Sequence, residues 1–181
     1  MNVIKTDLDG VLILEPNVFE DERGFFMESF NADVFRDAVG EDFNFVQDNH
    51  SRSSRGVLRG IHYQIKQAQG KLVRVVNGAV FDVAVDLRKS SSNFGKWVGV
   101  ELSEENRRQF WVPPGFGHAF LALSEKVDFL YKTTDFYAPK HERGIIWSDP
   151  DINVDWPEGM DLILSGKDQE ASRLRDAEVY A

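Results

Sequence analysis

The sequence predicts an all-β domain, a sandwich or a barrel, with few helices. Apolar residues alternate with a period of two over most of the chain, turn signals separate short segments, and a single stretch has helical spacing. The 181 residues and 42% hydrophobic content are enough for one domain with a sizeable core. No linker, repeat or low-complexity stretch divides the chain, so we expect one domain over residues 1–181.

The expected elements follow in chain order. One helix is expected at 32–39, where Asn31 can cap its start and Gly40 stands where a helix ends. Asn77 and Gly78 supply the turn of a hairpin between two of the strands. The segments expected as strands are 11–14, 25–30, 43–51, 57–63, 72–76, 79–87, 97–102, 109–112, 119–123, 127–134 and 144–147. Residues 157–181 are a charged, turn-rich tail, expected at the periphery with a short helix after Asp168, where it can close over a site.

The charge is unevenly distributed along the chain. The net charge is −9, which argues against a generic nucleic-acid or anionic-membrane binder. Residues 49–81 nevertheless contain six basic and no acidic residues: Arg52, Arg55, Arg59, Lys66, Lys71 and Arg74. This segment points to an anionic ligand, or alternatively to a solvated strand face in which the clustering has no function.

The chain has no cysteine, which excludes a disulfide scaffold, a thiol nucleophile and a thiolate metal site. Its first ten residues lack the apolar segment of a signal peptide. The longest uncharged stretch, 109–124, is too short and too interrupted by proline and glycine to span a bilayer. We therefore expect a cytoplasmic protein with no membrane partner.

Two of the four histidines stand in informative contexts. His118 ends the pattern P-x-G-x-x-H, which is typical of the second cupin motif, and His62 lies in an expected strand of the basic segment. Metal-binding cupins carry H-x-H in their first motif, but Gln64 occupies the second histidine position here and no glutamate follows before residue 81. Two imidazoles and an amide make a poor divalent-metal site. The pattern predicts a jelly roll without a metal.

Without a metal, His62 would act as an acid or a base, because imidazole titrates near neutrality. The alternative is a structural histidine on a half-buried strand. Arg59 and Lys71 are near, and a base beside cations suits an acidic C–H next to a carbonyl, whose enolate the cations would stabilise. Tyr131 lies in an apolar strand and is either a core residue or the acid partner of a histidine. Arg23 is either part of an ordinary turn or a phosphate ligand.

Seven segments together closely resemble the dTDP-4-dehydrorhamnose 3,5-epimerase family. They are DERGFFMESF (21–30), FVQDNHSRSSRGVLRGIHYQ (45–64), QGKLVRVVNGAVFDVAVDLR (69–88), FGKW (94–97), VPPGFGHAF (112–120), YKTTDFYAP (131–139) and GIIWSDP (144–150). The resemblance implies a metal-independent cupin, a double-stranded β-helix or jelly roll with a few short peripheral helices. It also implies a homodimer without a cofactor that acts on dTDP-4-dehydro-6-deoxy-D-glucose in dTDP-L-rhamnose biosynthesis.

The resemblance also implies roles for individual residues. His62 would remove the protons at C3 and C5, Asp168 would orient its imidazole, Lys71 would stabilise the enolate, and Tyr131 would return a proton on the opposite face. Arg23 and Arg59 would bind the diphosphate. The further substrate contacts would be Glu28, Gln47, Asn49, His118, Glu142 and Lys167.

Three possibilities compete with a double epimerase. The same fold includes epimerases that invert only one carbon, although His62, Lys71 and Tyr131 together favour double inversion. A metal-dependent cupin isomerase or oxygenase is opposed by the missing H-x-H. The third possibility is a non-catalytic sugar-nucleotide binder. The chain departs from the family in GFGHAF, where GFAHGF is usual, and in the residues that follow Asp168.

Overall fold

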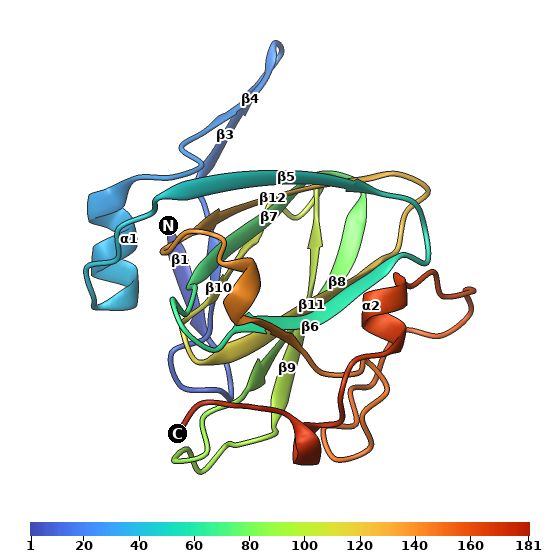
Figure 1. Ribbon diagram of the computed structural model, residues 1–181. Helices are drawn as coiled ribbons and strands as arrows, with labels where there is room; N and C mark the ends of the chain where they lie inside the picture. Colours follow the sequence, from blue (N-terminus) through green and yellow to red (C-terminus); the bar gives the residue numbers. More distant parts are fainter.

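A computed structural model describes residues 1–181 and shows two antiparallel sheets that face each other (Figure 1). In spatial order, the six-stranded sheet contains β1 (Asn2–Lys5), β2 (Leu12–Glu15), β10 (Gln109–Val112), β7 (Lys71–Asn77), β12 (Val127–Thr133) and β5 (Gln47–Ser53). The five-stranded sheet contains β13 (Glu142–Gly144), β6 (Leu58–Gln64), β11 (Phe116–Ala122), β8 (Ala79–Asp86) and β9 (Trp97–Ser103). The expectation of an all-β jelly roll with few short helices is confirmed.

The period of two along the strands sorts side chains between the core and the two outer faces. On β10, Phe110 and Val112 enter the core between the sheets, whereas Trp111 points outward beneath helix α1 (Ala32–Val39). On β6, Ile61 and Tyr63 belong to a second apolar cluster on the outer face of the five-stranded sheet. Their neighbours in the strand, including His62, therefore face the space between the sheets.

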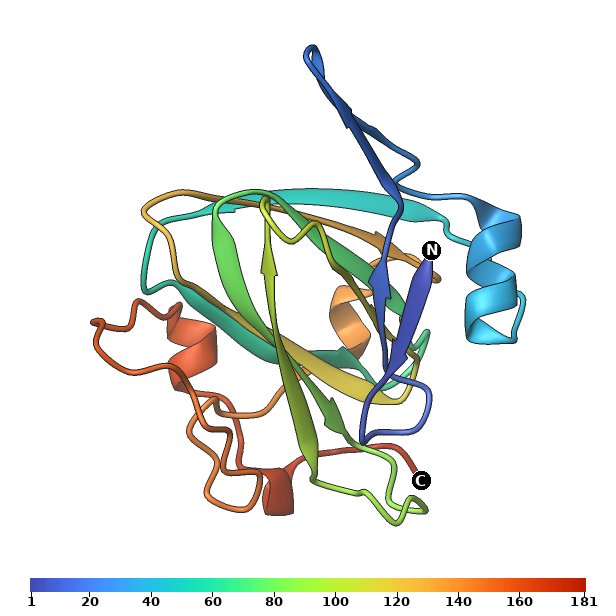
Figure 2. The same cartoon turned by 180° about the vertical axis from the view of Figure 1, so that it is seen from behind.

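The C-terminal segment covers that second cluster. Ile152, Leu174 and Val179 pack on the outer face of the five-stranded sheet. The segment carries the helix α2 (Gly166–Gln169) and the 3-10 helix η2 (Leu174–Asp176); another 3-10 helix, η1 (Pro139–His141), precedes β13. Viewed from behind, in Figure 2, the segment runs along one end of the two sheets and brings α2 to the edge of the barrel.

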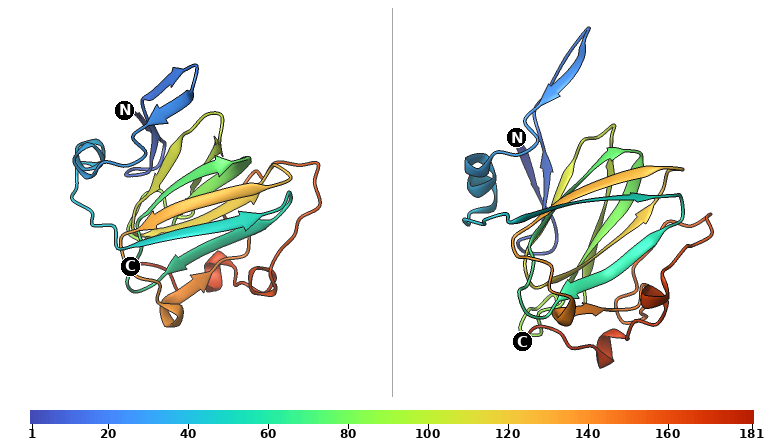
Figure 3. Two further views of the ribbon diagram at one scale, coloured as in Figure 1. Left: turned by 90° about the horizontal axis from the view of Figure 1, so that it is seen from above. Right: turned by 45° about the horizontal axis from the view of Figure 1, so that its top comes forward.

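A two-stranded arm stands apart from both sheets. It consists of β3 (Val18–Asp21) and β4 (Gly24–Met27), which pair with each other and with no other strand. Figure 3 shows the arm projecting away from the barrel in two further views. Three of its phenylalanines are exposed: Phe19, Phe25 and Phe26. We refer to residues 18–27 as the arm.

Local signals predicted some elements well and others badly. The helix is confirmed at both ends, because the Asn31 side chain accepts hydrogen bonds from the first turn and Gly40 adopts a left-handed φ of 80°. The expected strands at 25–30 and 43–51 are wrong in extent. β4 ends at Met27, and β5 begins only at Gln47, because Phe43 and Phe45 pack against Trp111 on the outer face of the sheet.

Other errors concern short or polar elements. β1 and β3 were not expected, since their four-residue segments are mostly exposed and show no clear apolar alternation. β13 covers 142–144 instead of 144–147. The tail helix starts at Gly166 instead of following Asp168, because Ser165 caps it.

Candidate active site

A cavity of about 520 Å³ opens between the two sheets. The tail closes one side of it, because Ile163 pairs with Val57 and its carbonyl accepts a hydrogen bond from the Leu58 N–H at 3.0 Å. Most of the residues singled out in the sequence line this cavity: Arg59, His62, Lys71, His118, Tyr131, Lys167 and Asp168. The topology thus brings together side chains from four strands and the tail.

His62 and Asp168 form a pair at the wall of the cavity. His62 Nε2 lies 2.5 Å from Asp168 Oδ1, although the two residues are 106 positions apart in sequence. Only 5% of the Asp168 side chain is exposed. Burial alone would raise the pKa of this carboxyl, but the hydrogen bonds from His62 and Ser165 hold it below its ordinary value. Asp168 is therefore an anion that keeps a proton on Nε2 and leaves His62 Nδ1 free to accept one.

Ser165 determines where the Asp168 carboxylate points. Its hydroxyl oxygen accepts the Asp168 backbone N–H at 3.2 Å and donates to Asp168 Oδ2 at 2.7 Å. This is a capping arrangement at the start of α2, in which the serine satisfies a backbone donor and the acid is fixed in the first turn. Both carboxylate oxygens are thereby occupied, one by Ser165 and the other by His62.

The acid and base candidates lie on opposite walls of the cavity. His62 on β6 and His118 on β11 belong to the five-stranded sheet, where they are directly opposite each other in register. Lys71 on β7 and Tyr131 on β12 belong to the six-stranded sheet. A ligand between the sheets would present one face to His62 and the other to Tyr131.

Burial changes the acidity of both groups on the six-stranded wall. It raises the pKa of the Tyr131 phenol, with Arg59 opposing the shift, so the phenol keeps its proton at neutral pH. Burial also lowers the pKa of the Lys71 ammonium to about 8, against the attraction of Asp82 and Glu142. Lys71 is therefore a poorly solvated cation at neutral pH, which is suited to stabilise a developing negative charge.

Asp82 is a cavity-side residue that sequence reasoning missed. It is fully buried on β8, and its Oδ1 lies 2.8 Å from His118 Nε2. Burial raises the pKa of Asp82 and lowers that of His118. The available signal was an acid at an inward position in the middle of the apolar segment 79–86, because a core does not tolerate a buried acid without a partner.

Three more candidates, together with Lys167 and Tyr137, form a hydrogen-bonded chain beside the cavity. Lys167 Nζ lies 2.5 Å from Glu142 Oε1, and Glu142 Oε2 accepts the Tyr137 hydroxyl at 2.9 Å. The Tyr137 backbone N–H donates to Gln47 Oε1 at 3.0 Å, and Gln47 Nε2 donates to Asn49 Oδ1 at 2.9 Å. Lys167 belongs to both the chain and the cavity wall, so the two groups are continuous.

Tyr137 was missed because it stands in a loop without a recognisable pattern. Gln64, the residue at the second histidine position of the metal-binding motif, holds this loop in place. Its amide donates to the Phe136 carbonyl at 3.2 Å and accepts from the Ala138 N–H at 2.8 Å, the two residues that flank Tyr137. Gln64 is 4% exposed, and through these two hydrogen bonds it holds the backbone of the loop on both sides of Tyr137.

Arg59 and His62 are separated by a glycine that the fold requires. Gly60 has a φ of 120°, and a Cβ at this position would lie 2.6 Å from the His118 carbonyl oxygen. The close approach of β6 to β11 therefore excludes any side chain. The Arg59 guanidinium points along the cavity wall and donates from Nε to Ser53 Oγ at 3.2 Å.

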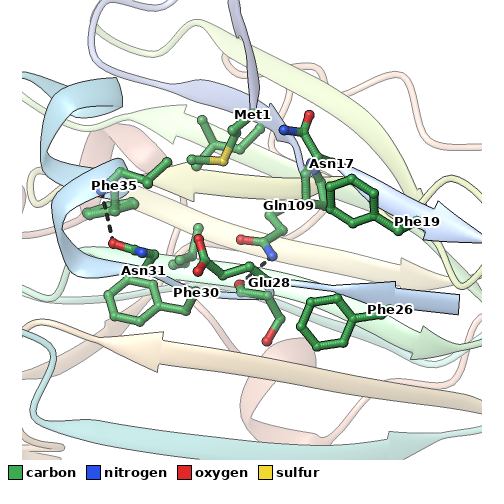
Figure 4. A pocket seen from close by; sticks show the side chains of 14 residues that line it. Met1, Asn17, Phe19, Phe26, Glu28, Phe30, Asn31, Phe35 and Gln109 are labelled. Atoms are coloured by element: carbon green, nitrogen blue, oxygen red, sulfur yellow. Dashed lines mark hydrogen bonds between the residues drawn. The ribbon is translucent and has the colours of Figure 1, made fainter.

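The structure does not bring Arg23 and Glu28 to the cavity. Arg23 lies at the tip of the arm, where it pairs with Asp21. Glu28 lines a separate pocket of about 280 Å³ at the base of the arm. Figure 4 shows Glu28 in this pocket among Phe26, Phe30 and Gln109. Within one chain, these two candidates thus lie away from the cavity that His62 lines.

No three residues of the types His, Cys, Asp and Glu are grouped so that they could hold a metal ion. None of the helices has the length and apolar character needed to cross a membrane.

Known proteins are similar to this chain over almost its whole length. A family model described as dTDP-4-dehydrorhamnose 3,5-epimerase matches residues 5–176. The chain belongs to the dTDP-4-dehydrorhamnose 3,5-epimerase family. A dTDP-4-dehydrorhamnose 3,5-epimerase of Shigella flexneri is 60% identical over 181 residues, which covers 99% of each chain. The fold matches the crystal structure of the dTDP-6-deoxy-D-glucose-3,5-epimerase of Legionella pneumophila, in complex with dTDP-4-keto-L-rhamnose, with a TM-score of 0.96 and 53% identity over 98% of this chain and 94% of that one.

The relatives of this chain also include an enzyme named for inversion at one carbon. A dTDP-4-dehydrorhamnose 3-epimerase of Streptomyces niveus is 40% identical over 171 residues, which cover 94% of this chain and 82% of that protein. Similarity to these proteins therefore indicates epimerisation of a dTDP-sugar, but relatives that invert one carbon and relatives that invert two are both similar to this chain.

Proposed function

We propose that the protein is an isomerase that inverts C3 and C5 of dTDP-4-dehydro-6-deoxy-D-glucose to give dTDP-4-dehydro-L-rhamnose, in dTDP-L-rhamnose biosynthesis. One observation carries the proposal: the His62–Asp168 pair and Tyr131 line a single cavity from facing sheets. Family membership and the 60% identity to a 3,5-epimerase support the same reaction.

In the proposed reaction, the C4 ketone of the substrate acidifies the neighbouring C3–H and C5–H bonds. His62 removes one of these protons, and the electron pair of the broken C–H bond moves to the C4 oxygen as an enolate. Asp168 stabilises the resulting imidazolium, and Lys71 stabilises the enolate oxygen. Collapse of the enolate then takes a proton back at the same carbon.

Inversion requires that the returning proton arrives on the other face of the sugar. Tyr131 is suited to donate it, because its phenol lies on the sheet opposite His62 and keeps its proton at neutral pH. The two steps leave the atoms of the sugar unchanged and alter only the configuration at one carbon. Solvent then takes the proton from His62 and returns one to Tyr131, and repetition at the second carbon gives the double epimer without a cofactor.

Substrate binding would use the remaining candidates. Arg59 at the cavity wall is suited to the diphosphate, since a guanidinium donates two parallel hydrogen bonds to phosphate oxygens. His118 and Lys167 line the same cavity, and the chain that joins Glu142, Gln47 and Asn49 offers amide and carboxylate groups beside it. These groups would hold the sugar and the nucleotide.

The reaction is tested by incubating the purified protein with substrate in heavy water. Deuterium should enter at both C3 and C5, because each carbon exchanges a proton with the enzyme. Label at one carbon alone would assign the protein to the single-inversion class represented by the Streptomyces relative. No label, with dTDP-sugar still bound, would indicate a non-catalytic binder.

Two controls test the base and the independence from metal. His62→Ala should abolish turnover while the nucleotide sugar still binds; a variant with unchanged turnover would remove His62 from the mechanism. Activity that survives a strong chelator would exclude a metal-dependent isomerase or oxygenase. Loss of activity in the chelator, with recovery on addition of a divalent metal, would contradict the proposal.

We infer further that the active protein is a homodimer in which the arm of one copy reaches the other. The arm pairs with no strand of its own chain, exposes three phenylalanines and carries Arg23, a candidate diphosphate ligand that lies away from its own cavity. A second copy of the chain would cover the aromatic residues and receive Arg23. A cytoplasmic location and the absence of nucleic-acid and membrane partners stay predictions.

Mixed dimers test the exchange of arms. A His62→Ala chain and an Arg23→Ala chain, combined in one dimer, give one site with an intact base and the intact arm of the partner. The purified mixed dimer should show about half of wild-type activity at low substrate. If each arm served its own cavity, every site in the mixture would carry a defect and no activity would return.

A further inference from the structure

A single arginine outside the cavity holds the arm to the barrel. Arg107 Nη1 lies 2.6 Å from Glu20 Oε1 on β3, and its guanidinium carbon is 4.2 Å from the centre of the Phe25 ring on β4. The Glu20–Arg107 contact is the only hydrogen bond that joins residues 18–27 to the rest of the protein. Arg107 therefore contacts both strands of the arm.

The contacts of Arg107 fall on one face of the arm. Glu20 and Phe25 are directly opposite each other in the β3–β4 register, so their side chains share a face. Phe19 and Phe26 are the next opposed pair and occupy the other face. That second face is open, with Phe19 65% and Phe26 71% exposed, and it lines the pocket that contains Glu28.

Arg107 is itself rigidly placed. It has a left-handed φ of 54°, which is unusual for a residue other than glycine, and its N–H donates to the Ser103 carbonyl at 3.0 Å. Asn106 and Ser103 exchange side-chain hydrogen bonds in the same turn. The turn connects β9 of the five-stranded sheet to β10 of the six-stranded sheet, so its position is fixed by both.

The Arg107 side chain is also more enclosed than a surface ion pair requires. It is 22% exposed, against 63% for the Glu20 side chain, and its Nε is buried without a hydrogen-bond partner. The ion pair with Glu20 and the contact with the Phe25 ring replace part of the hydration that this guanidinium has lost, and both contacts are on the arm. The neighbouring Arg108 pairs with Glu15 on β2 instead and does not contact the arm.

We propose that Arg107 is a positioning residue that fixes the orientation of the arm by holding its Glu20–Phe25 face. The opposite face, with Phe19 and Phe26, is thereby held over the pocket that contains Glu28 and stays open to a second copy of the chain. The functional part rests on the role of the arm proposed above, whereas the restraint on the arm is a property of the chain itself.

The test uses Arg107→Asn in the full-length protein, since asparagine tolerates the left-handed backbone but is too short to reach the arm. Amide hydrogen exchange in residues 18–27 should become roughly tenfold faster, with β10 and β12 unchanged. KM for the nucleotide sugar should rise roughly threefold to tenfold with kcat within about twofold. Arg107→Lys should raise KM less than Arg107→Asn does, because lysine keeps the charge but loses the planar contact with Phe25.

Arg108→Gln is the matched control, because it removes an ion pair from the same turn without touching the arm. It should leave both arm exchange and KM at wild-type values. Unchanged exchange in Arg107→Asn would overturn the restraint itself. Faster exchange with an unchanged KM would retain the restraint and reject its role in binding, and a fall in kcat alone would contradict positioning. The exchange measurement stands even if the protein lacks epimerase activity.

Discussion

The cavity and the arm are built in opposite ways. In the cavity, Asp168 is 4% exposed and both of its oxygens are hydrogen-bonded, and His118 is paired with a fully buried acid. In the arm, large aromatic side chains are exposed and one hydrogen bond joins two strands to the barrel. Proton transfer needs groups held in place before the substrate arrives, whereas a segment that contributes only to binding can be held by fewer contacts.

This contrast predicts that cavity substitutions lower turnover and arm substitutions raise KM. Each variant below tests one side of that division, and the expected effects decrease from the first to the last.

The largest effect is expected from Asp168→Asn. The amide keeps the shape of the side chain but not its negative charge, so it no longer stabilises the imidazolium of His62. kcat should fall about 10³-fold to 10⁴-fold, as in other histidine–carboxylate pairs. Binding of dTDP, measured by calorimetry, should change little. A fall of less than tenfold would show that the pair is structural.

The outer face of the barrel provides a matched control for Asp168→Asn. His50 Nε2 lies 3.0 Å from Asp128 Oδ1, a second histidine–aspartate pair that does not line the cavity. Asp128→Asn should leave kcat within about twofold of wild type, since no proposed step uses it.

Lys71→Met should lower kcat/KM about 10²-fold to 10³-fold, because the enolate oxygen loses its cation. In the wild-type enzyme, kcat should decline as the pH rises through about 8, where Lys71 loses its proton. The pH profile of kcat checks this expectation. A profile that stays flat to pH 10 would remove the Lys71 charge from the mechanism.

The same residue has a consequence for stability. The pKa of Lys71 is lower in the folded protein than the ordinary 10.5, so between pH 8 and 10.5 the unfolded chain binds more protons at this site. The contribution of Lys71 to stability therefore rises with pH through that window. Lys71→Met, which removes the half-buried charge, should melt at a higher temperature than wild type at pH 7. A lower melting temperature would mean that the ammonium stabilises the fold.

Tyr131→Phe should separate inversion from proton exchange. His62 would still remove and return protons on its own face, whereas the opposite face would lack a donor. Epimerisation should fall roughly tenfold to 10²-fold. Wash-in of deuterium from heavy water, followed by NMR, should fall less. Equal losses would mean that the phenol mainly positions the substrate.

The smallest effect is expected in the arm. Arg23→Ala should raise KM roughly tenfold with kcat nearly unchanged, because it removes a diphosphate contact and leaves the cavity intact. Arg36→Ala, which removes an exposed arginine from α1, is the control and should change neither constant. A fall in kcat for Arg23→Ala would break the division between the two regions.

Local rules predicted what local contacts determine. The helix begins after Asn31 and ends before Gly40 as expected, because the hydrogen bonds that cap it lie within a few residues. The inward orientation of His62 follows from the strand period. The paired strands of the arm were not predicted, because β3 and β4 are mostly exposed and have no buried face that would produce an alternating apolar pattern.

The site could be predicted only where the residues resembled known motifs. The contact between His62 and Asp168 joins positions 106 apart, which no spacing rule predicts. Asp82 and Tyr137 were missed because their partners, His118 and Glu142, come from other strands. Arg107 gave no signal, since its function depends on the direction in which the arm leaves the barrel.

The carboxylate partner of His62 is supplied by a segment that follows every strand of both sheets. Every strand of both sheets lies before residue 145, whereas the segment that closes the cavity and carries Asp168 lies at 163–168. A chain that is unfinished, or that a protease has cut before residue 163, retains all the strands but leaves His62 without its carboxylate. We therefore expect turnover to require an intact segment 163–168, whereas nucleotide binding through the strands should not.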